Sequence, residues 1–339
     1  MVTNLTLHDL PLPLPANEMF LKVLLVLAFI AHIIFVNLMV GGSILTLVFQ
    51  FMGRQQDRYD LLAKKLAKTI TVNKSLAVVL GVAPLLLINV LYTVFFYSAN
   101  ILTGNAWISV VPLVAIAFLL TYLHQYSWER LAANKMLHIS INIVATAIFL
   151  VVPMIFLANV NLMLFPERWG EVRGFSSALL MPSVLPRYFH FLAASVVLTA
   201  LFLVGFWSRP LAKEEVREMG FDVNKLQREL YLIAFMVSLS QLIIGPILLL
   251  TLPRPGISWA LIATVGIGAV ASLPALVLMW LEIIAETPVI GRRYWSVIAS
   301  LGLTTLLMAS GRHLYREEAI RSAKAAVQLK ANMPIGVLR

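Results

Sequence analysis

Cysteine is absent from this 339-residue chain. Its absence excludes disulfides, iron–sulfur clusters held by thiolates and covalently attached c-type heme, so histidine or methionine would have to hold any metal centre. Charged residues are also scarce, at 12% of the sequence. No Walker phosphate loop, dinucleotide glycine fingerprint or His-Glu-x-x-His zinc motif occurs, so the sequence offers no sign of the enzyme classes that carry them.

Apolar residues dominate, at 60% of the chain with a mean hydropathy of +0.89, which is typical of a protein that has the bilayer as its solvent. Apolar runs of about 20 residues predict membrane-spanning helices. The predicted spans are 19–51, 72–97, 106–127, 136–163, 180–207, 230–252, 257–281 and 294–311. We therefore expect an all-α polytopic bundle of eight helices, with one membrane domain over residues 1–311 and a basic tail over 312–339.

Lysine and arginine indicate the orientation. The stretch 54–74 carries six basic residues and the stretch 209–228 carries five, which places both on the inner side by the positive-inside rule. The N-terminus and, after eight spans, the C-terminus are then outside, although the basic tail does not follow the rule. The formal charge of +10 reflects this topology and requires no nucleic-acid partner.

Histidines at membrane depth are the candidate functional residues. An ionisable side chain is costly to place inside a bilayer, so its presence there indicates a function. His32 lies within the first predicted span, and His190 and His313 lie near the outer ends of the fifth and eighth. His124 and His138 lie near inner helix ends, where a structural role is the favoured interpretation. His8 belongs to a short external leader.

A heme iron needs one or two axial donors, and imidazoles from different helices can clamp the porphyrin between them. Arginines beside them can hold the propionates through charge-assisted hydrogen bonds. Arg187 precedes His190 by three residues, and Arg312 adjoins His313. Candidate axial donors and candidate propionate partners therefore lie close together in the sequence. The competing interpretation is that these histidines only cap helix ends.

Several short segments, in this order, are similar to subunit I of the cytochrome bd quinol oxidases. They are His32-Ile-Ile-Phe-Val followed by Gly41-Gly42, residues 73–82, Trp128-Glu-Arg-Leu, Arg187-Tyr-Phe-His190, Val265-Gly-Ile-Gly and Gly311-Arg312. The resemblance implies a low-spin heme b with His190 as a ligand and a location in the bacterial cytoplasmic membrane. Its second ligand would be His313 or, in one register, Met236; the best register places Thr264 there instead.

Departures from that family concern its two reaction sites. Only residues 253–256 stand where the family has a long quinol-binding loop, so the quinol site of the family is in doubt. The family's membrane carboxylates are also missing: Asn89 lies in the second span, and Ala309 stands where an acid would ligate a high-spin heme. We therefore expect electron transfer without oxygen reduction.

These features predict a membrane subunit that binds one or two b-type hemes, with His32 as the ligand of a second heme and a quinone as a further candidate ligand. It would pass electrons between the quinone pool and an extracytoplasmic partner such as a c-type cytochrome, within a hetero-oligomer. The alternative is a heme-free scaffold or transport subunit that kept the bundle.

Overall fold

The structure is a computed structural model that describes residues 14–285 and 291–331, and within these residues it contains helices and no strand. The elements are α1 (Glu18–Met52), α2 (Asp57–Leu91), α3 (Thr93–Thr103), α4 (Asn105–Tyr126), η1 (Ala132–Asn134), α5 (Lys135–Met163), η2 (Pro166–Glu171), α6 (Phe175–Leu179), α7 (Val184–Trp207), α8 (Pro210–Glu218), α9 (Val223–Thr251), η3 (Arg254–Gly256), α10 (Trp259–Ile284) and α11 (Arg292–Ala331).

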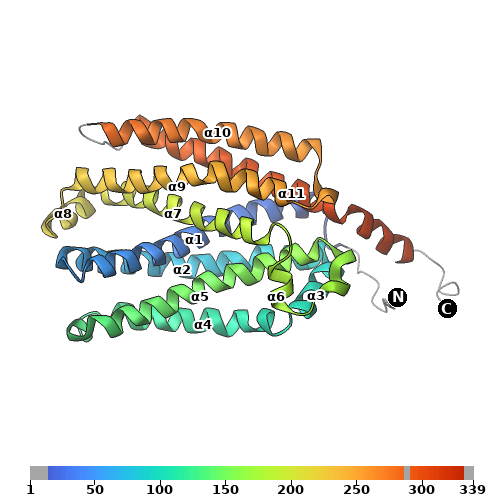
Figure 1. Cartoon of the computed structure of the whole chain (residues 1–339), viewed down its shortest axis with the longest axis horizontal. Coiled ribbons are helices and arrows are strands. Elements are labelled where there is room, and N and C mark those ends of the chain that lie inside the picture. Colours follow the sequence, from blue (N-terminus) through green and yellow to red (C-terminus); the bar gives the residue numbers. More distant parts are fainter. Residues whose placement is uncertain (1–13, 286–290, 332–339) are drawn as a thin grey trace.

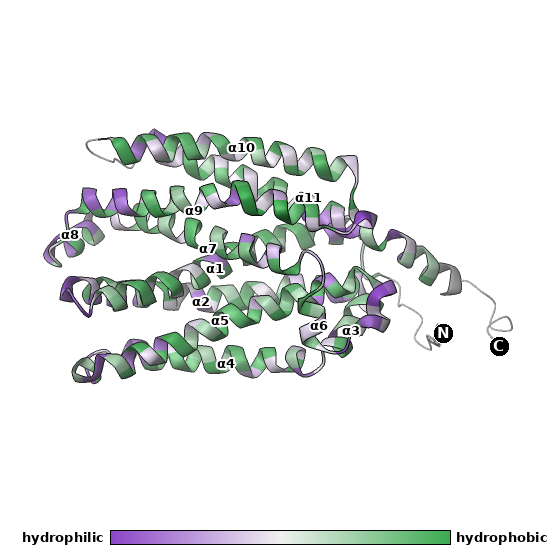
Figure 2. Ribbon diagram, in the orientation of Figure 1, coloured by the Kyte–Doolittle hydropathy of each residue, from purple (hydrophilic) through white to green (hydrophobic). Residues whose placement is uncertain are grey.

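Eight helices of the described chain are long and apolar enough to cross a membrane, which confirms the predicted all-α polytopic fold. They are α1, α2, α4, α5, α7, α9, α10 and α11. Figure 2 shows hydrophilic residues gathered towards the two ends of the bundle and hydrophobic residues between them.

The predicted boundaries of the second span are wrong. α2 begins at Asp57 rather than near residue 72, and it ends at Leu91, after which α3 forms separately. Buried residues recur every four positions before the apolar run, at Leu62, Leu66 and Ile70. This helical spacing leads into the apolar run, so a single helix covers both the basic stretch and the span.

The last helix is longer than its apolar run. α11 continues through residue 311, where the sequence suggested the start of a tail, and ends at Ala331. Figure 1 shows this extension projecting beyond the ends of the other long helices.

The long helices form two groups of four that meet along α1 and α7 (Figure 1). In the first group α1 packs against α2 and α5, and α4 packs against α5; in the second group α9 packs against α7 and α10, and α10 packs against α11. Prolines lie inside five of these helices, as the sequence predicts: Pro84, Pro112, Pro153, Pro246 and Pro274.

The buried apolar residues are unevenly distributed. A large cluster that includes Trp207, Tyr231 and Met279 lies where α7 ends and α9 begins, whereas no residue of α9 beyond Ala234 is buried. The candidate site lies at the opposite end of this group, where α7 begins.

Candidate functional site

Three arginines come together where the start of α7 meets α11, at the end of the bundle from which α11 projects (Figure 1). Arg187 of α7 interacts electrostatically with Arg312 and Arg316 of α11. The Arg187 guanidinium donates to Ser183 Oγ at 3.4 Å, and the Arg312 guanidinium carbon lies 4.3 Å from the centroid of the Phe29 ring. Only 6% of Arg316 is exposed.

Within the described ranges 14–285 and 291–331, none of these three arginines forms a salt bridge. Cationic side chains are rarely buried without a negative partner, because removing a charge from water costs several kcal/mol. The arginine cluster, defined as Arg187, Arg312 and Arg316, is therefore complementary to an anion. Arg316 was missed in the sequence because it is one turn beyond the predicted end of the span.

His190 lies one turn deeper than Arg187 on α7. Its Nδ1 is buried, and its backbone carbonyl accepts from Gln241 Nε2 of α9 at 3.2 Å. The Gln241 side chain also acts as a hydrogen-bond partner of the His190 ring. Gln241 thus holds His190 at this position between α7 and α9.

His313 does not lie against His190. No ring contact or electrostatic interaction joins the two histidines in the part of the chain that the structure describes, whereas the rings of His124 and His138 stack at 4.3 Å. His313 interacts electrostatically with Arg316 of the arginine cluster and with Glu317 and Lys22. Two axial ligands of one iron lie on opposite faces of the porphyrin and do not touch each other, so the pairing of His190 with His313 stays a prediction.

Met236 is 57% exposed on α9. Five residues separate it from Gln241, so at 3.6 residues per turn the two side chains leave the helix about 140° apart. Because Gln241 faces His190, Met236 faces away from it. Thr264, the third candidate for the position opposite His190, donates its hydroxyl to Ala260 O of its own helix at 2.7 Å.

His32 has the geometry of a ligand histidine. Its Nδ1 and the carbonyl oxygen of Ala77 are 2.8 Å apart, so Nδ1–H donates and Nε2 is left with its lone pair. The ring packs on Gly81, where an added Cβ would lie 2.8 Å from His32 Cε1. Arg312 acts electrostatically on His32, which places this histidine beside the arginine cluster.

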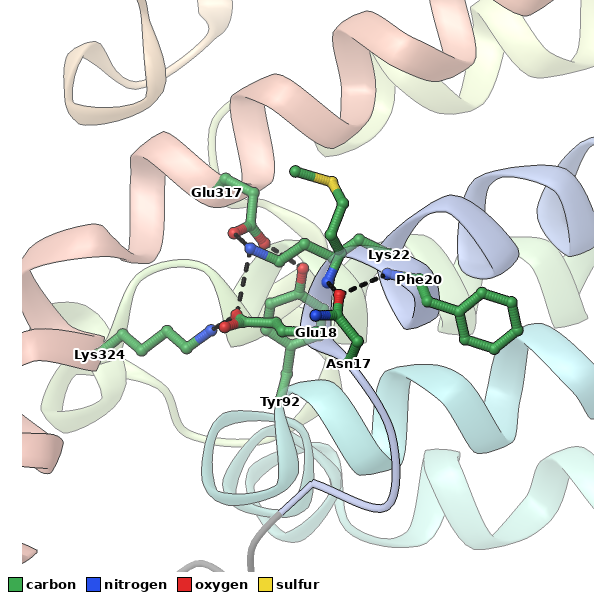
Figure 3. Close-up of polar contacts among 8 residues, drawn as sticks. Asn17, Glu18, Phe20, Lys22, Tyr92, Glu317 and Lys324 are labelled. Carbon is green, nitrogen blue, oxygen red and sulfur yellow. Dashed lines mark hydrogen bonds and ion pairs between the residues drawn. The ribbon is translucent and has the colours of Figure 1, made fainter.

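An ion-pair network fixes α11 against the start of α1 (Figure 3). Lys22 pairs with Glu18 at 3.2 Å and with Glu317, and Lys324 binds Glu18 at 2.5 Å. The Tyr92 hydroxyl also donates to Glu317, and burial together with that carboxylate raises the pKa of Tyr92. The tyrosine therefore remains a hydrogen-bond donor throughout the neutral pH range, and the network sets the position of Arg312 and Arg316.

An apolar groove lies between α1, α7 and α9 on a different side of α7 from Arg187. It has a volume of about 470 Å³ and is lined by side chains that include Ile44, Phe189 and Ile247. A smaller hollow of about 210 Å³ lies in the external segment, beside Arg168 and Ser177. The first can accommodate an acyl or isoprenoid chain, but no polar side chain lines it to orient a head group.

Sequence reasoning also missed polar side chains at depth. His124 and His138 are 3% and 4% exposed and belong to a hydrogen-bonded network with Gln50 and Asn142. Lys74, counted from sequence with the inner basic stretch 54–74, is buried in α2 and is 6% exposed. A carboxylate is buried as well: Glu282 of α10 is 3% exposed and pairs with Arg293 at 3.6 Å.

No protein-family model and no curated protein matches the sequence. Among solved structures, the chain is similar to a chain of the bd oxidase from Geobacillus thermodenitrificans, with a TM-score of 0.71 and 13% sequence identity. The similarity covers 92% of this chain and 93% of that chain, so the two are of nearly equal length. The protein therefore has the fold of a bd oxidase chain, a membrane bundle of eight spanning helices.

Proposed function

We propose that the chain is a b-type heme subunit of a respiratory electron-transfer complex in the bacterial cytoplasmic membrane. The observation that carries the proposal is the arginine cluster: three arginines without a carboxylate partner in the described chain, beside His190 and His32. The two propionates of a heme supply the negative charge that such a cluster requires, and imidazole is the commonest axial donor.

The residues present fit a heme in three respects. The His190 ring is buried, the Nε2 of His32 is available, and α9 contributes no buried residue beyond Ala234. His190 and His32 would act as axial donors, and Arg187, Arg312 and Arg316 would hold propionates. Bound heme supplies a one-electron centre; the chain's own residues fix its position and exclude water from it.

The second axial donor to His190 is not assigned to His313 or Met236, since one lies near Lys22 and Glu317 and the other is exposed. Single histidine ligation at each site is the simplest arrangement that the geometry supports.

We also propose that electrons pass between the quinone pool and an extracytoplasmic partner, within a hetero-oligomer. A fold shared with a bd oxidase chain supports a multi-subunit membrane complex. Both proposed ligands lie towards the end of the bundle from which α11 projects, so a c-type cytochrome on that side would be a suitable acceptor. The quinone tail would use the apolar groove along Phe189.

Heme content tests the proposal at the residues named. Replacing His190 by Ala should remove heme from the purified protein, and His32→Ala should remove it from the second site. Met236→Leu is the matched control and should retain the full heme content, since this side chain is exposed. Full heme content in both histidine variants would contradict the assignment.

A further inference from the structure

The inner half of the first helix group has a polar core. Three helices place polar side chains on their buried faces at spacings of three or four residues, which align them on one side of each helix, and a fourth helix adds one such residue. All are at most 6% exposed: Ser43, Thr46 and Gln50 on α1, Lys74 on α2, Thr121 and His124 on α4, and His138, Asn142 and Thr146 on α5. We call these nine residues the polar column. A bundle held together by apolar packing alone does not need such residues.

Hydrogen bonds connect the inner members of the column. His124 Nε2 donates to Gln50 Oε1 at 3.1 Å, and Asn142 Nδ2 donates to the same oxygen at 2.8 Å. Gln50 Nε2 donates to His138 Nδ1 at 3.1 Å, and His138 Nε2 donates to the His124 carbonyl at 2.7 Å. Thr146 Oγ1 donates to Asn142 Oδ1 at 3.4 Å and extends the chain one turn deeper.

The column begins at the inner surface. Trp128 packs edge-on against the rings of His124 and His138, with centroids 4.9 and 4.6 Å apart, and its Nε1 donates to Asp60 Oδ2 at 3.2 Å. Asp60 belongs to the first turn of α2, next to the loop that carries the basic residues. These polar atoms thus connect the surface with the interior of the first helix group.

Lys74 lies at the deep end of the column. Its ammonium nitrogen is 5.3 Å from the centroid of Phe149, within an apolar cluster that includes Val40 and Ala117. It forms no salt bridge or hydrogen bond within residues 14–285 and 291–331. Lys74 is one turn before Ala77, whose carbonyl accepts from His32.

Among the residues whose side chains the structure describes, no carboxylate compensates the charge of Lys74. The titratable groups around it are His124 of α4, on which it acts electrostatically, and His32 of α1, one turn away; α5 presents the Phe149 ring. An unpaired ammonium at this depth is costly, but the cost falls when a negative charge arrives nearby.

We propose that this polar column is a proton-uptake route from the inner surface to Lys74, and that Lys74 binds one proton when an electron reaches a group held by His32. The step balances: one electron arrives at the group that His32 would hold, one proton converts the lysine amine to an ammonium, and the net charge of the site does not change. The inference rests on the proposed function for its electron acceptor and adds a residue that couples the electron to a proton.

Spectroelectrochemical titration tests the coupling, with electrons supplied by an electrode and mediators to the purified full chain. If one proton is bound per electron, the midpoint potential of the His32 site should fall by up to about 59 mV for each tenfold decrease in proton concentration. Lys74→Met should abolish this pH dependence while heme content stays normal. Lys68→Met is the matched control, because Lys68 is exposed on the same helix, and it should retain the dependence.

Two further variants keep the test decisive. Lys74→Arg introduces a side chain that stays protonated, so it should also abolish the pH dependence if the methionine variant does not fold. Asn142→Leu interrupts the column. It should slow proton uptake after photoreduction, measured with a pH-indicator dye, without changing the pH dependence of the midpoint potential.

A Lys74→Met protein with normal heme and unchanged pH dependence would overturn this inference alone. A wild-type chain without heme would overturn the proposed function, and the redox link with it.

Discussion

At the scale of single residues, the site depends on how His32 is held. Its ring is fixed by a hydrogen bond to Ala77 O on one side and by the bare backbone of Gly81 on the other. Histidines that ligate metals commonly donate their second nitrogen in this way, because the bond fixes both the tautomer and the ring orientation. The sequence identified His32 but not the glycine that makes room for it.

Gly81→Ala should therefore displace His32. The new Cβ would lie 2.8 Å from Cε1 and 3.1 Å from Nδ1 of the ring, so the ring must move and the bond to Ala77 weakens. We expect loss of the heme at this site, measured by pyridine hemochromogen assay, with the His190 site unaffected. Gly302→Ala is the control, since no atom lies within 4 Å of the added methyl group. Unchanged heme stoichiometry in the Gly81 variant would show that His32 is not a ligand.

Arg316 makes a second prediction at this scale. A buried arginine that holds a propionate stabilises it by charge-assisted hydrogen bonds of about 1.5–3 kcal/mol, so Arg316→Gln should weaken heme retention about tenfold or more. The loss of a positive charge should also lower the midpoint potential. Arg321→Gln, on the same helix but 73% exposed at its side chain, should change neither quantity. A normal heme affinity in the Arg316 variant would remove this residue from the site.

At the scale of elements, α11 links the site to the ion-pair network. Glu317 accepts from Lys22 and Tyr92, which come from α1 and from the residue after α2, so one carboxylate connects three segments of the chain. These contacts are partly buried, and partly buried ion pairs in a network contribute more than isolated exposed ones.

Glu317→Gln should lower the thermal unfolding midpoint by several degrees, because Lys22 and Tyr92 lose a charged acceptor. Glu318→Gln is a closely matched control: the two glutamate side chains are equally exposed, at 26%, but Glu318 pairs only with Arg321, three residues away. The measurement is thermal unfolding in detergent, followed by circular dichroism. Equal midpoints for the two variants would show that the network does not fix α11.

Hydropathy was sufficient to predict most elements, and its failures have physical causes. It found eight spans because length and apolarity set them. It placed the start of the second span too late. Lys64, Lys65 and Lys68 lower the hydropathy of the residues before the apolar run, although the helix continues through them. Lys74 was counted with the inner basic stretch for the same reason. The relation between His190 and His313 could not be predicted, because their shared depth does not specify which side of each helix they occupy.

At the scale of the whole molecule, we propose electron transfer without oxygen reduction, because Asn89 and Ala309 stand where the resemblance to bd oxidase subunit I implies carboxylates. Lys74 and the His124–His138 pair can bind protons, but Ala309 cannot ligate an iron and residues 253–256 are too short for a quinol-binding loop. We expect no cyanide-sensitive oxygen consumption by the purified chain with a reduced quinol, measured with an oxygen electrode. Robust cyanide-sensitive quinol oxidation by the chain alone would contradict this expectation.

The central claim is that the bundle binds heme. Its most direct test is a reduced-minus-oxidised visible spectrum of the purified wild-type chain, combined with a pyridine hemochromogen assay and expressed with ample heme supply. The proposed ligands His190 and His32 predict a sharp b-type alpha band and about two hemes per chain. A folded protein that contains no heme would contradict the claim and would identify the bundle as a heme-free scaffold.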